Sequence, residues 1–343
     1  MDISEFIPSA ASYQAQAAHL ISKFFEINEL TTQQECDEHA SSIADQVVSP
    51  TTLQGQKSYT VVAADESMVI QFRPPDCPLE VPDMDMARTT YGRRFVPACV
   101  FRESWRGLFV YVMDATQGEA LAIVRQDLYT KENKHILSST MSDYSASVSP
   151  PLSREKFMSF FAVSWTNRPA TPPGVDIRQI YQEYDSHLSA LSDTVPPKFY
   201  SRLNTARNQL WRIFDPSHPI AFNHGNLTDT NVHVDKTTGR ITGVIDWSGS
   251  RLGPFGTSLY GVDIALGVQS MNEWHWHPNH VELRKQFWET LSNIVGPLTD
   301  DQISAMKIAR SVGLFLTFGY CNGVPVEDDD SRLAYLDAFL GVE

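Results

Sequence analysis

The spacing of apolar positions predicts that the chain begins with helices and continues into β-strands. Apolar residues recur at helical spacing over residues 10–29, and a second helical pattern covers 33–48. The pattern then changes to two short runs rich in β-branched and aromatic residues, 58–62 and 68–73, joined by a polar turn. We therefore expect an N-terminal helical segment over residues 1–50, followed by an antiparallel sheet.

Two further strands complete this sheet in the predicted order. Apolar runs at 96–101 and 108–113 flank Arg106-Gly107, which is typical of a tight turn, and a short helix is expected near 84–91. The strand patterns end before residue 118. Residues 51–117 are therefore expected to form a small β-rich lobe.

The remainder, residues 118–343, is expected to form a larger helical lobe. Helical patterns cover 119–213, apart from Ser- and Pro-rich stretches at 138–153 and 171–174 that predict loops, and they return from 259 to the end. A polar hairpin at 220–247 interrupts them. The predicted fold class is α+β, with two lobes.

Composition and charge disfavour some classes of binding partner. The 343 residues are 42% hydrophobic, and 41 acidic against 27 basic residues give a formal charge of −14, which disfavours nucleic acid and anionic membranes as partners. The longest apolar run, 312–318, is too short to cross a bilayer, and the acidic start lacks the pattern of a signal peptide. The four cysteines have no C-x-x-C spacing. We expect a cytoplasmic protein with a small-molecule substrate, and the sequence sets no oligomeric state.

The hairpin at 220–247 contains the candidate metal-binding residues. Residues 223–235 read as a polar loop entering a short strand, a turn follows at 237–239, and 243–247 read as a second strand. Such a hairpin can place Asn231 beside Asp246. Amide and carboxylate oxygens are ligands that Mg²⁺ accepts when it also keeps waters and nucleotide phosphates.

This hairpin resembles that of the aminoglycoside phosphotransferase and choline kinase family, relatives of the protein kinases. The resemblance rests on H-G-N-x-x-x-x-N at 224–231, on I-D-W at 245–247 and on the following G-P-F-G turn at 253–256. It extends over roughly residues 30–340 and is closest to a divergent fungal branch. It implies a two-lobed protein-kinase-like fold, with a small antiparallel β N-lobe and a larger helical C-lobe, and it implies that Asn231 and Asp246 are metal ligands.

The resemblance also implies where a nucleotide would bind. Residues 53–60, with Gly55 and Ser58, correspond to the hairpin that covers the phosphates. Arg73 stands where the family has its phosphate-pairing cation, and Met113 falls in the hinge. Mg-ATP is a cofactor on this reading only if nucleotide binding has been retained.

One departure from the family pattern bears on the reaction. Asn226 occupies the position of the catalytic aspartate, and a neutral amide is not a usable base. General-base catalysis contributes about 10²–10⁴ in rate. The cation is Arg73 instead of lysine, and no certain acidic partner for it is visible, the candidates being Glu80, Asp83 and Asp85. Asp229 is a candidate replacement base, because three residues of extended chain reach about 10 Å.

Other polar residues have two interpretations each. His224 either supports the loop, the favoured interpretation, or donates a hydrogen bond to substrate; Arg73 either binds phosphate or pairs with an acid such as Asp85. The run Trp274-His275-Trp276-His277 is assigned with Asp229 to the substrate pocket. A zinc site at its histidines and His280 is disfavoured, because no cysteine or carboxylate stands at supporting spacing.

Three functions remain open on the sequence. The favoured hypothesis is a cleft put to new use in specialised metabolism, as a cyclase or isomerase that holds a substrate in its reactive conformer and polarises it through Asn226, His224 or Arg73. Pericyclic, Diels-Alder-like chemistry is one example. The alternatives are an ATP- and Mg²⁺-dependent small-molecule O-phosphotransferase and a noncatalytic, pseudokinase-like binding protein.

Overall fold

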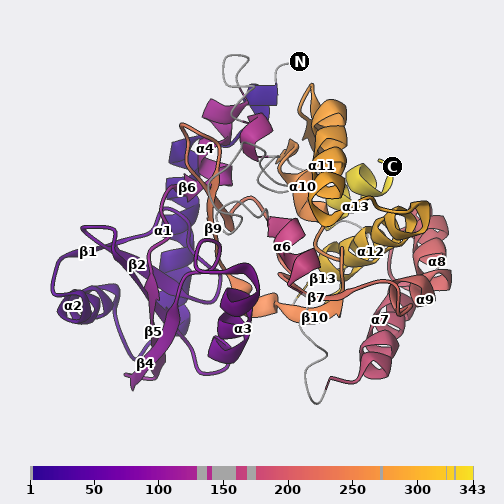
Figure 1. The fold of residues 1–343 in the computed structure, drawn as a ribbon. Helices are drawn as coiled ribbons and strands as arrows, with labels where there is room; N and C mark the ends of the chain where they lie inside the picture. Colours follow the sequence, from indigo (N-terminus) through magenta and orange to yellow (C-terminus); the bar gives the residue numbers. More distant parts are fainter. Residues whose placement is uncertain are drawn as a thin grey trace.

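The computed structural model of the protein describes residues 3–129, 137–140, 160–167, 175–270, 273–321, 323–327 and 330–342, and it shows two lobes (Figure 1). The predicted loop at 171–174 lies outside these residues, as does 141–153 of the other loop. The described elements before and in the β-rich lobe are η1 (Ile3–Phe6), α1 (Ala10–Ile27), α2 (Gln33–Ala44), β1 (Val48–Pro50), β2 (Tyr59–Ala63), β3 (Met68–Arg73), α3 (Val81–Tyr91), β4 (Cys99–Trp105) and β5 (Leu108–Asp114).

The N-lobe is built on a five-stranded antiparallel sheet in the order β1-β2-β3-β5-β4. Strand β2 alternates buried and half-buried residues, as expected where one face of a sheet is covered. Arg106 and Gly107, with φ of 45° and 78°, make the β4–β5 turn, and this hand of turn matches the twist of a hairpin. The predicted sheet is therefore present.

Two boundaries differ from the sequence prediction. Helix α2 ends at Ala44, because Asp45 adopts a left-handed conformation with φ of 55°, and residues 48–50 leave the helix to form the edge strand β1. Strand β4 begins at Cys99 instead of 96 and continues to Trp105 through a bulge between Phe101 and Glu103. A bulge inserts a residue, which breaks the alternation used to place strands.

The N-terminal helical segment contacts both lobes instead of standing apart. Phe24 of α1 and Cys36 of α2 are buried in the core beneath the sheet with Tyr59 and Phe72. At the other end of α1, the Tyr13 hydroxyl donates to the Ala122 carbonyl oxygen at 3.2 Å in the C-lobe. Helix α1 thus contacts both lobes.

The C-lobe is mainly helical; helices α7 to α13 lie on the right of Figure 1, whereas α4, β6 and β9 lie beside α1. Its described elements are β6 (Glu119–Ala120), α4 (Leu121–Leu128), α6 (Phe160–Thr166), α7 (Ile177–Leu191), η2 (Pro197–Phe199), α8 (Tyr200–Asn208), α9 (Leu210–Ile213), β7 (Ile220–Asn223), β8 (Val232–Val234), β9 (Ile241–Val244), η3 (Trp247–Gly249), β10 (Arg251–Pro254), α10 (Tyr260–Ile264), β11 (Gly267–Ser270), β12 (Glu273–Trp276), α11 (His280–Val295), α12 (Asp300–Phe318), β13 (Tyr320–Cys321), β14 (Val324–Pro325) and α13 (Leu333–Leu340).

The central helix of this lobe is α12, whose start is encoded locally. The Thr299 side chain accepts from the Gln302 N–H, and the Gln302 side chain accepts from the Thr299 N–H, which makes a capping box. Helix α12 then buries a stripe that includes Met306, Val312 and Phe315 in the large core. None of the described helices is both long and apolar enough to span a bilayer.

The C-lobe also contains strands that helical periodicity did not predict. Strands β11 and β12 pair antiparallel, with Gln269 opposite Trp274 and Val268 opposite His275. The expected return of helical structure from 259 therefore does not hold at 267–270 and 273–276, which are strands. Trp274 and Trp276 are two residues apart, and this period of two is the signal of a strand.

Candidate functional site

The polar hairpin forms where it was expected, at the junction of the lobes. Strand β8 pairs with β9, and the Ile245 N–H donates to the Asn231 carbonyl oxygen at 2.9 Å, which sets Asn231 beside the segment carrying Asp246. The second strand is shorter than predicted, because Asp246 leaves extended geometry for a left-handed conformation and 247–249 form a 3₁₀ turn.

Gly225 is required by the packing of the loop. Its φ is 76°, and a Cβ at this position would lie 2.0 Å from the carbonyl oxygen of Gly249. The Leu227 N–H is fixed in turn by the Tyr260 hydroxyl at 3.2 Å. The loop before Asn231 is thus held against η3 and α10.

His224 is fully buried and supports this loop. Its Nε2 lies 2.8 Å from the Ile245 carbonyl oxygen, and its Nδ1 accepts from the Asn226 N–H at 3.3 Å. The ring also meets the edge of Trp247. These contacts match the architectural interpretation, and they leave neither ring nitrogen to polarise a substrate.

Burial lowers the pKa of His224, and the folded protein therefore holds the ring neutral. The stability from this group is complete above the unfolded pKa of about 6.5 and is lost as the pH falls below it, because only the unfolded chain then takes up the proton. We expect the free energy of unfolding to fall from pH 7 to 5, with His224 contributing at most about 1.4 kcal/mol per pH unit.

Urea denaturation across this range measures the effect. His224→Gln should have a shallower pH dependence than wild type, while His19→Gln, at an exposed position of α1, should keep the wild-type slope. A variant at 224 with the unaltered slope would show that this histidine does not titrate differently in the folded protein.

Asn226, Asn231 and Asp246 are joined by hydrogen bonds. The Asn231 side-chain Nδ2 donates to the Asn226 carbonyl oxygen at 2.9 Å, which turns Asn231 Oδ1 away from this bond. The Asn226 Nδ2 donates to Asp246 Oδ2 at 3.4 Å, and the Ser248 hydroxyl donates to Asp246 Oδ1 at 2.7 Å. The amide that replaces the expected base is thus directed at Asp246, the carboxylate predicted to bind a metal.

The donor set fits a hard cation such as Mg²⁺. Asn231 Oδ1 and the remaining lone pairs of Asp246 are oxygen donors of the kind that Mg²⁺ uses together with water. When bound with a nucleotide, such an ion neutralises phosphate charge. In contrast, no set of three or more His, Cys, Asp and Glu side chains in the described parts of the chain is placed to hold a metal, and this includes the histidines at 275, 277 and 280.

The Arg73 side chain makes hydrogen bonds within the N-lobe. It is 8% exposed, its Nε donates to the Cys77 carbonyl oxygen at 2.7 Å, and its Nη1 donates to Gln71 Oε1 at 3.1 Å. No ion pair between Arg73 and a carboxylate is present in the described residues. The pairing with Asp85 that the sequence left open is therefore not observed, and the guanidinium secures the turn after β3.

The hairpin expected to cover phosphates is closed by a side chain. Gln54 bridges it, its Nε2 donating to the Thr60 carbonyl oxygen at 2.7 Å and its Oε1 accepting from the Thr60 N–H at 3.0 Å. Gly55 and Ser58 are adjacent, since a Cβ on Gly55 would lie 2.5 Å from Ser58 Oγ. Met113 is half-buried near the end of β5, as a hinge residue would be.

Asp229 is committed to an ion pair. Its Oδ2 lies 2.7 Å from Nη1 of Arg125, whose side chain is only 3% exposed. Burial and then the Asp229 charge raise the pKa of Tyr13 and of Tyr335. The carboxylate that was a candidate replacement base is thus engaged by a buried guanidinium. Sequence reasoning missed Arg125, whose signal is a lone cation in the apolar run Leu121–Leu128.

The aromatic run assigned to the substrate pocket packs mostly into the lobe. Trp274 and Trp276 contact Phe339 of α13, with ring centroids 4.8 and 5.5 Å away, and His277 is 4% exposed. His275 stacks on Phe6 at 3.5 Å. The Tyr335 ring lies 5.4 Å from that of Trp274. Trp274, His275 and Trp276 are half-buried at the edge of the core, and His277 is buried.

Comparison with known proteins agrees with this geometry. Residues 164–261 match the phosphotransferase enzyme family (APH), and the match includes the whole catalytic-loop hairpin. No curated protein gave a match to the sequence.

Two solved structures have the same fold. A thermostable mutant of aminoglycoside phosphotransferase APH(4)-Ia in ternary complex with ADP and hygromycin B has 14% identity and a TM-score of 0.52, over 82% of this chain and 90% of that one. The apo form of a thermostable mutant of the same enzyme has 13% identity and a TM-score of 0.53, over 89% and 93%. The expected family resemblance and the two-lobed α+β fold are confirmed.

Proposed function

We propose that this protein uses the cleft of a phosphotransferase fold to bind and convert a small molecule without transferring phosphate from ATP. The observation that carries the proposal is the side chain at 226. An amide stands where the reaction needs a proton acceptor, and its Nδ2 donates to Asp246. Lacking a base, this position can orient and polarise a substrate but cannot deprotonate a hydroxyl group.

The residues expected to bind ATP also support a function without phosphate transfer. The guanidinium of Arg73 is held by Gln71 and Cys77, and the Gln54 side chain fills the hairpin above. Asp229 is paired with Arg125 and does not replace the missing base. Two parts of the expected nucleotide site, the Arg73 cation and the phosphate-covering hairpin, are thus engaged in contacts within the chain.

The chemistry that suits such a cleft is a rearrangement, as in a cyclase or isomerase. Holding a flexible substrate in its reactive conformer can lower a barrier without a charged base. Asn226 is half-exposed and supplies an amide N–H to a carbonyl or ether oxygen, whereas both ring nitrogens of His224 are engaged and Arg73 is buried against Gln71 and Cys77. The proposed substrate is accordingly an apolar small molecule with one oxygen acceptor.

A second function has an observation in its favour. Asn231 and Asp246 keep an arrangement suited to Mg²⁺, and the family match covers both residues. An ATP- and Mg²⁺-dependent O-phosphotransferase remains the alternative, with water accepting the proton.

Phosphate release from Mg-ATP separates the two functions. We expect wild-type protein to release phosphate no faster than Asp246→Asn, which lacks the metal carboxylate. Turnover in the ordinary kinase range of about 1–100 s⁻¹ that Asp246→Asn abolishes would establish the alternative. In parallel, a thermal-shift screen of apolar metabolites should find compounds that stabilise wild type and not Asn226→Leu.

A further inference from the structure

A cavity of about 260 Å³ lies in the C-lobe among helices α8, α10, α11 and α12 and the end of α13. It is separate from the catalytic hairpin, since none of its lining residues belongs to 223–247. Helix α10 stands between the two sites: Tyr260 and Gly261 pack on Leu227 of the loop, whereas Val262 and Asp263 line the cavity.

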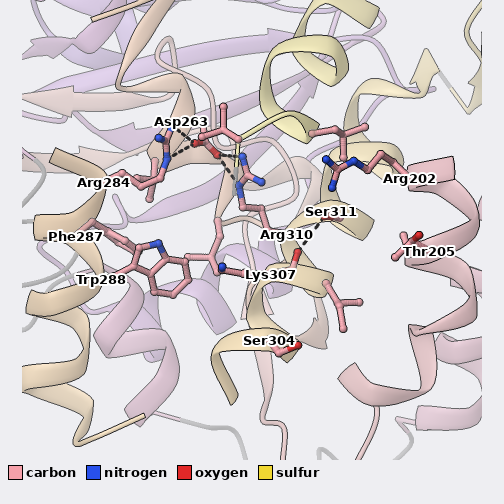
Figure 2. Close-up of a pocket in the computed structure, with 16 residues that line it drawn as sticks. Arg202, Thr205, Asp263, Arg284, Phe287, Trp288, Ser304, Lys307, Arg310 and Ser311 are labelled. Atoms are coloured by element: carbon pink, nitrogen blue, oxygen red, sulfur yellow. Dashed lines mark hydrogen bonds and ion pairs between the residues drawn. The ribbon is translucent and has the colours of Figure 1, made fainter. Parts of the chain in front are cut away.

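The wall of this cavity carries an excess of positive charge. Four cationic side chains line it, Arg202, Arg284, Lys307 and Arg310, against one carboxylate, Asp263. The chain as a whole has a formal charge of −14, so this concentration of cations is opposite to its average. Figure 2 shows Asp263 between Arg284 and Arg310. The Lys307 ammonium group is drawn next to the ring of Trp288.

The buried charged groups at this cavity, Asp263, Arg284 and Arg310, have a net positive charge. Asp263 is 2% exposed, its Oδ1 accepts from Arg284 Nη2 at 2.9 Å, and its Oδ2 accepts from Arg310 Nε at 2.6 Å. The two arginine side chains are only 13% and 12% exposed. A single carboxylate thus serves two largely buried guanidinium groups, and charged groups at such depth are normally paired.

A donor remains on this cluster. Arg310 uses Nε for Asp263 and Nη2 for the Phe339 carbonyl oxygen at 2.9 Å, and its Nη1 donates to none of the described residues. Lys307 is exposed on α12, and its ammonium group makes no ion pair within the described part of the chain. Guanidinium and ammonium groups with donors to spare are the usual binding groups for a carboxylate.

Apolar side chains form much of the rest of the wall, together with the hydroxyl groups of Thr205, Ser304 and Ser311. The apolar part includes Leu259, Ile308, Leu340 and the ring of Trp288. The volume is below the usual 300–1,000 Å³ of a drug-sized ligand site, so the occupant is small. We propose that this cavity is a binding site for a small amphipathic carboxylate, whose headgroup lies at Arg310 and Lys307 and whose hydrocarbon or aromatic body lies against Trp288 and Ile308.

Calorimetric titration of the full chain with octanoate tests the proposal. We expect one octanoate per chain, bound at least about tenfold more tightly than octanamide, which has the same body without the charge, and than inorganic phosphate, which has charge without the body. Affinity should fall with added salt. Absence of octanoate binding, or equal binding of octanamide, would overturn the carboxylate site; equal binding of phosphate would overturn the apolar part.

Variants locate the site. Lys307→Glu should weaken octanoate about tenfold or more, whereas Lys285→Glu, the same charge change at an exposed position of α11 outside the cavity, should leave affinity nearly unchanged. Ser304→Trp, which places an indole ring at the cavity wall, should abolish binding. Octanoate that binds Ser304→Trp or Lys307→Glu with wild-type affinity would lie elsewhere, and the proposal would be wrong.

Discussion

Replacing Asn226 with aspartate is expected to lower the free energy of unfolding by about 1 kcal/mol in metal-free buffer. The Asn226 Nδ2 now donates to Asp246 Oδ2 at 3.4 Å. Asn226→Asp removes this donor and sets a second carboxylate against the first. Because Asp246 is exposed, solvent screening limits the repulsion between the two charges to about 1 kcal/mol. The variant should recover most of this loss on addition of Mg²⁺, which binds both carboxylates.

Chemical denaturation with and without Mg²⁺ measures this effect, and Asn204→Asp on the exposed side of α8 is the matched control. The control should change stability by no more than about 0.5 kcal/mol, with no response to Mg²⁺. If Asn226→Asp were as stable as wild type without metal, the amide would not be needed to hold Asp246. A gain of about 10²–10⁴ in phosphate release by the same variant would favour the phosphotransferase alternative.

Replacing Asp263 with asparagine is expected to cost about 3–5 kcal/mol of stability, because it leaves Arg284 and Arg310 buried without a counter-charge. These contacts join α10, α11 and α12, and Arg310 also bonds α13, so the loss falls on the centre of the C-lobe. Whole domains are stable by only about 5–15 kcal/mol. Asp263→Asn should therefore melt well below wild type.

The matched control is Asp185→Asn, which breaks the exposed pair between Asp185 and Arg207. Both of these side chains are more than a third exposed, so this change should cost less than about 1 kcal/mol. Equal losses in the two variants, read from thermal or urea unfolding, would mean that burial does not govern the strength of these ion pairs.

Local signals in the sequence were enough to place much of the fold. The alternation in 58–73 and the Arg106-Gly107 turn identified strands β2 to β5, and the spacing of His224, Asn231 and Asp246 identified the hairpin. These signals succeed because strand period, turn geometry and motif spacing are properties of neighbouring residues. Strands β1, β11 and β12 were missed, since short strands paired within larger lobes give weak periodicity.

The roles of polar side chains were less predictable. Arg73 was interpreted as a phosphate or acid partner, and it bonds Gln71 and Cys77 instead. The Trp274–His277 run was assigned to a pocket, and Trp274 and Trp276 pack against α13 instead. Both outcomes depend on which distant segment lies nearby, and the sequence around these residues does not record that.

The sequence by itself determined that an amide, and not a carboxylate, stands at 226, and that Asn231 and Asp246 follow it on one hairpin. Only the tertiary structure decided that Asp229 is held by Arg125 and that Asp263 serves two arginines. The physical reason is that a residue's chemical type is local, whereas its charge partners and solvent exposure are set by segments that meet only when the chain folds. Asp263 and Arg310 are separated by 47 positions, and no periodic pattern connects them.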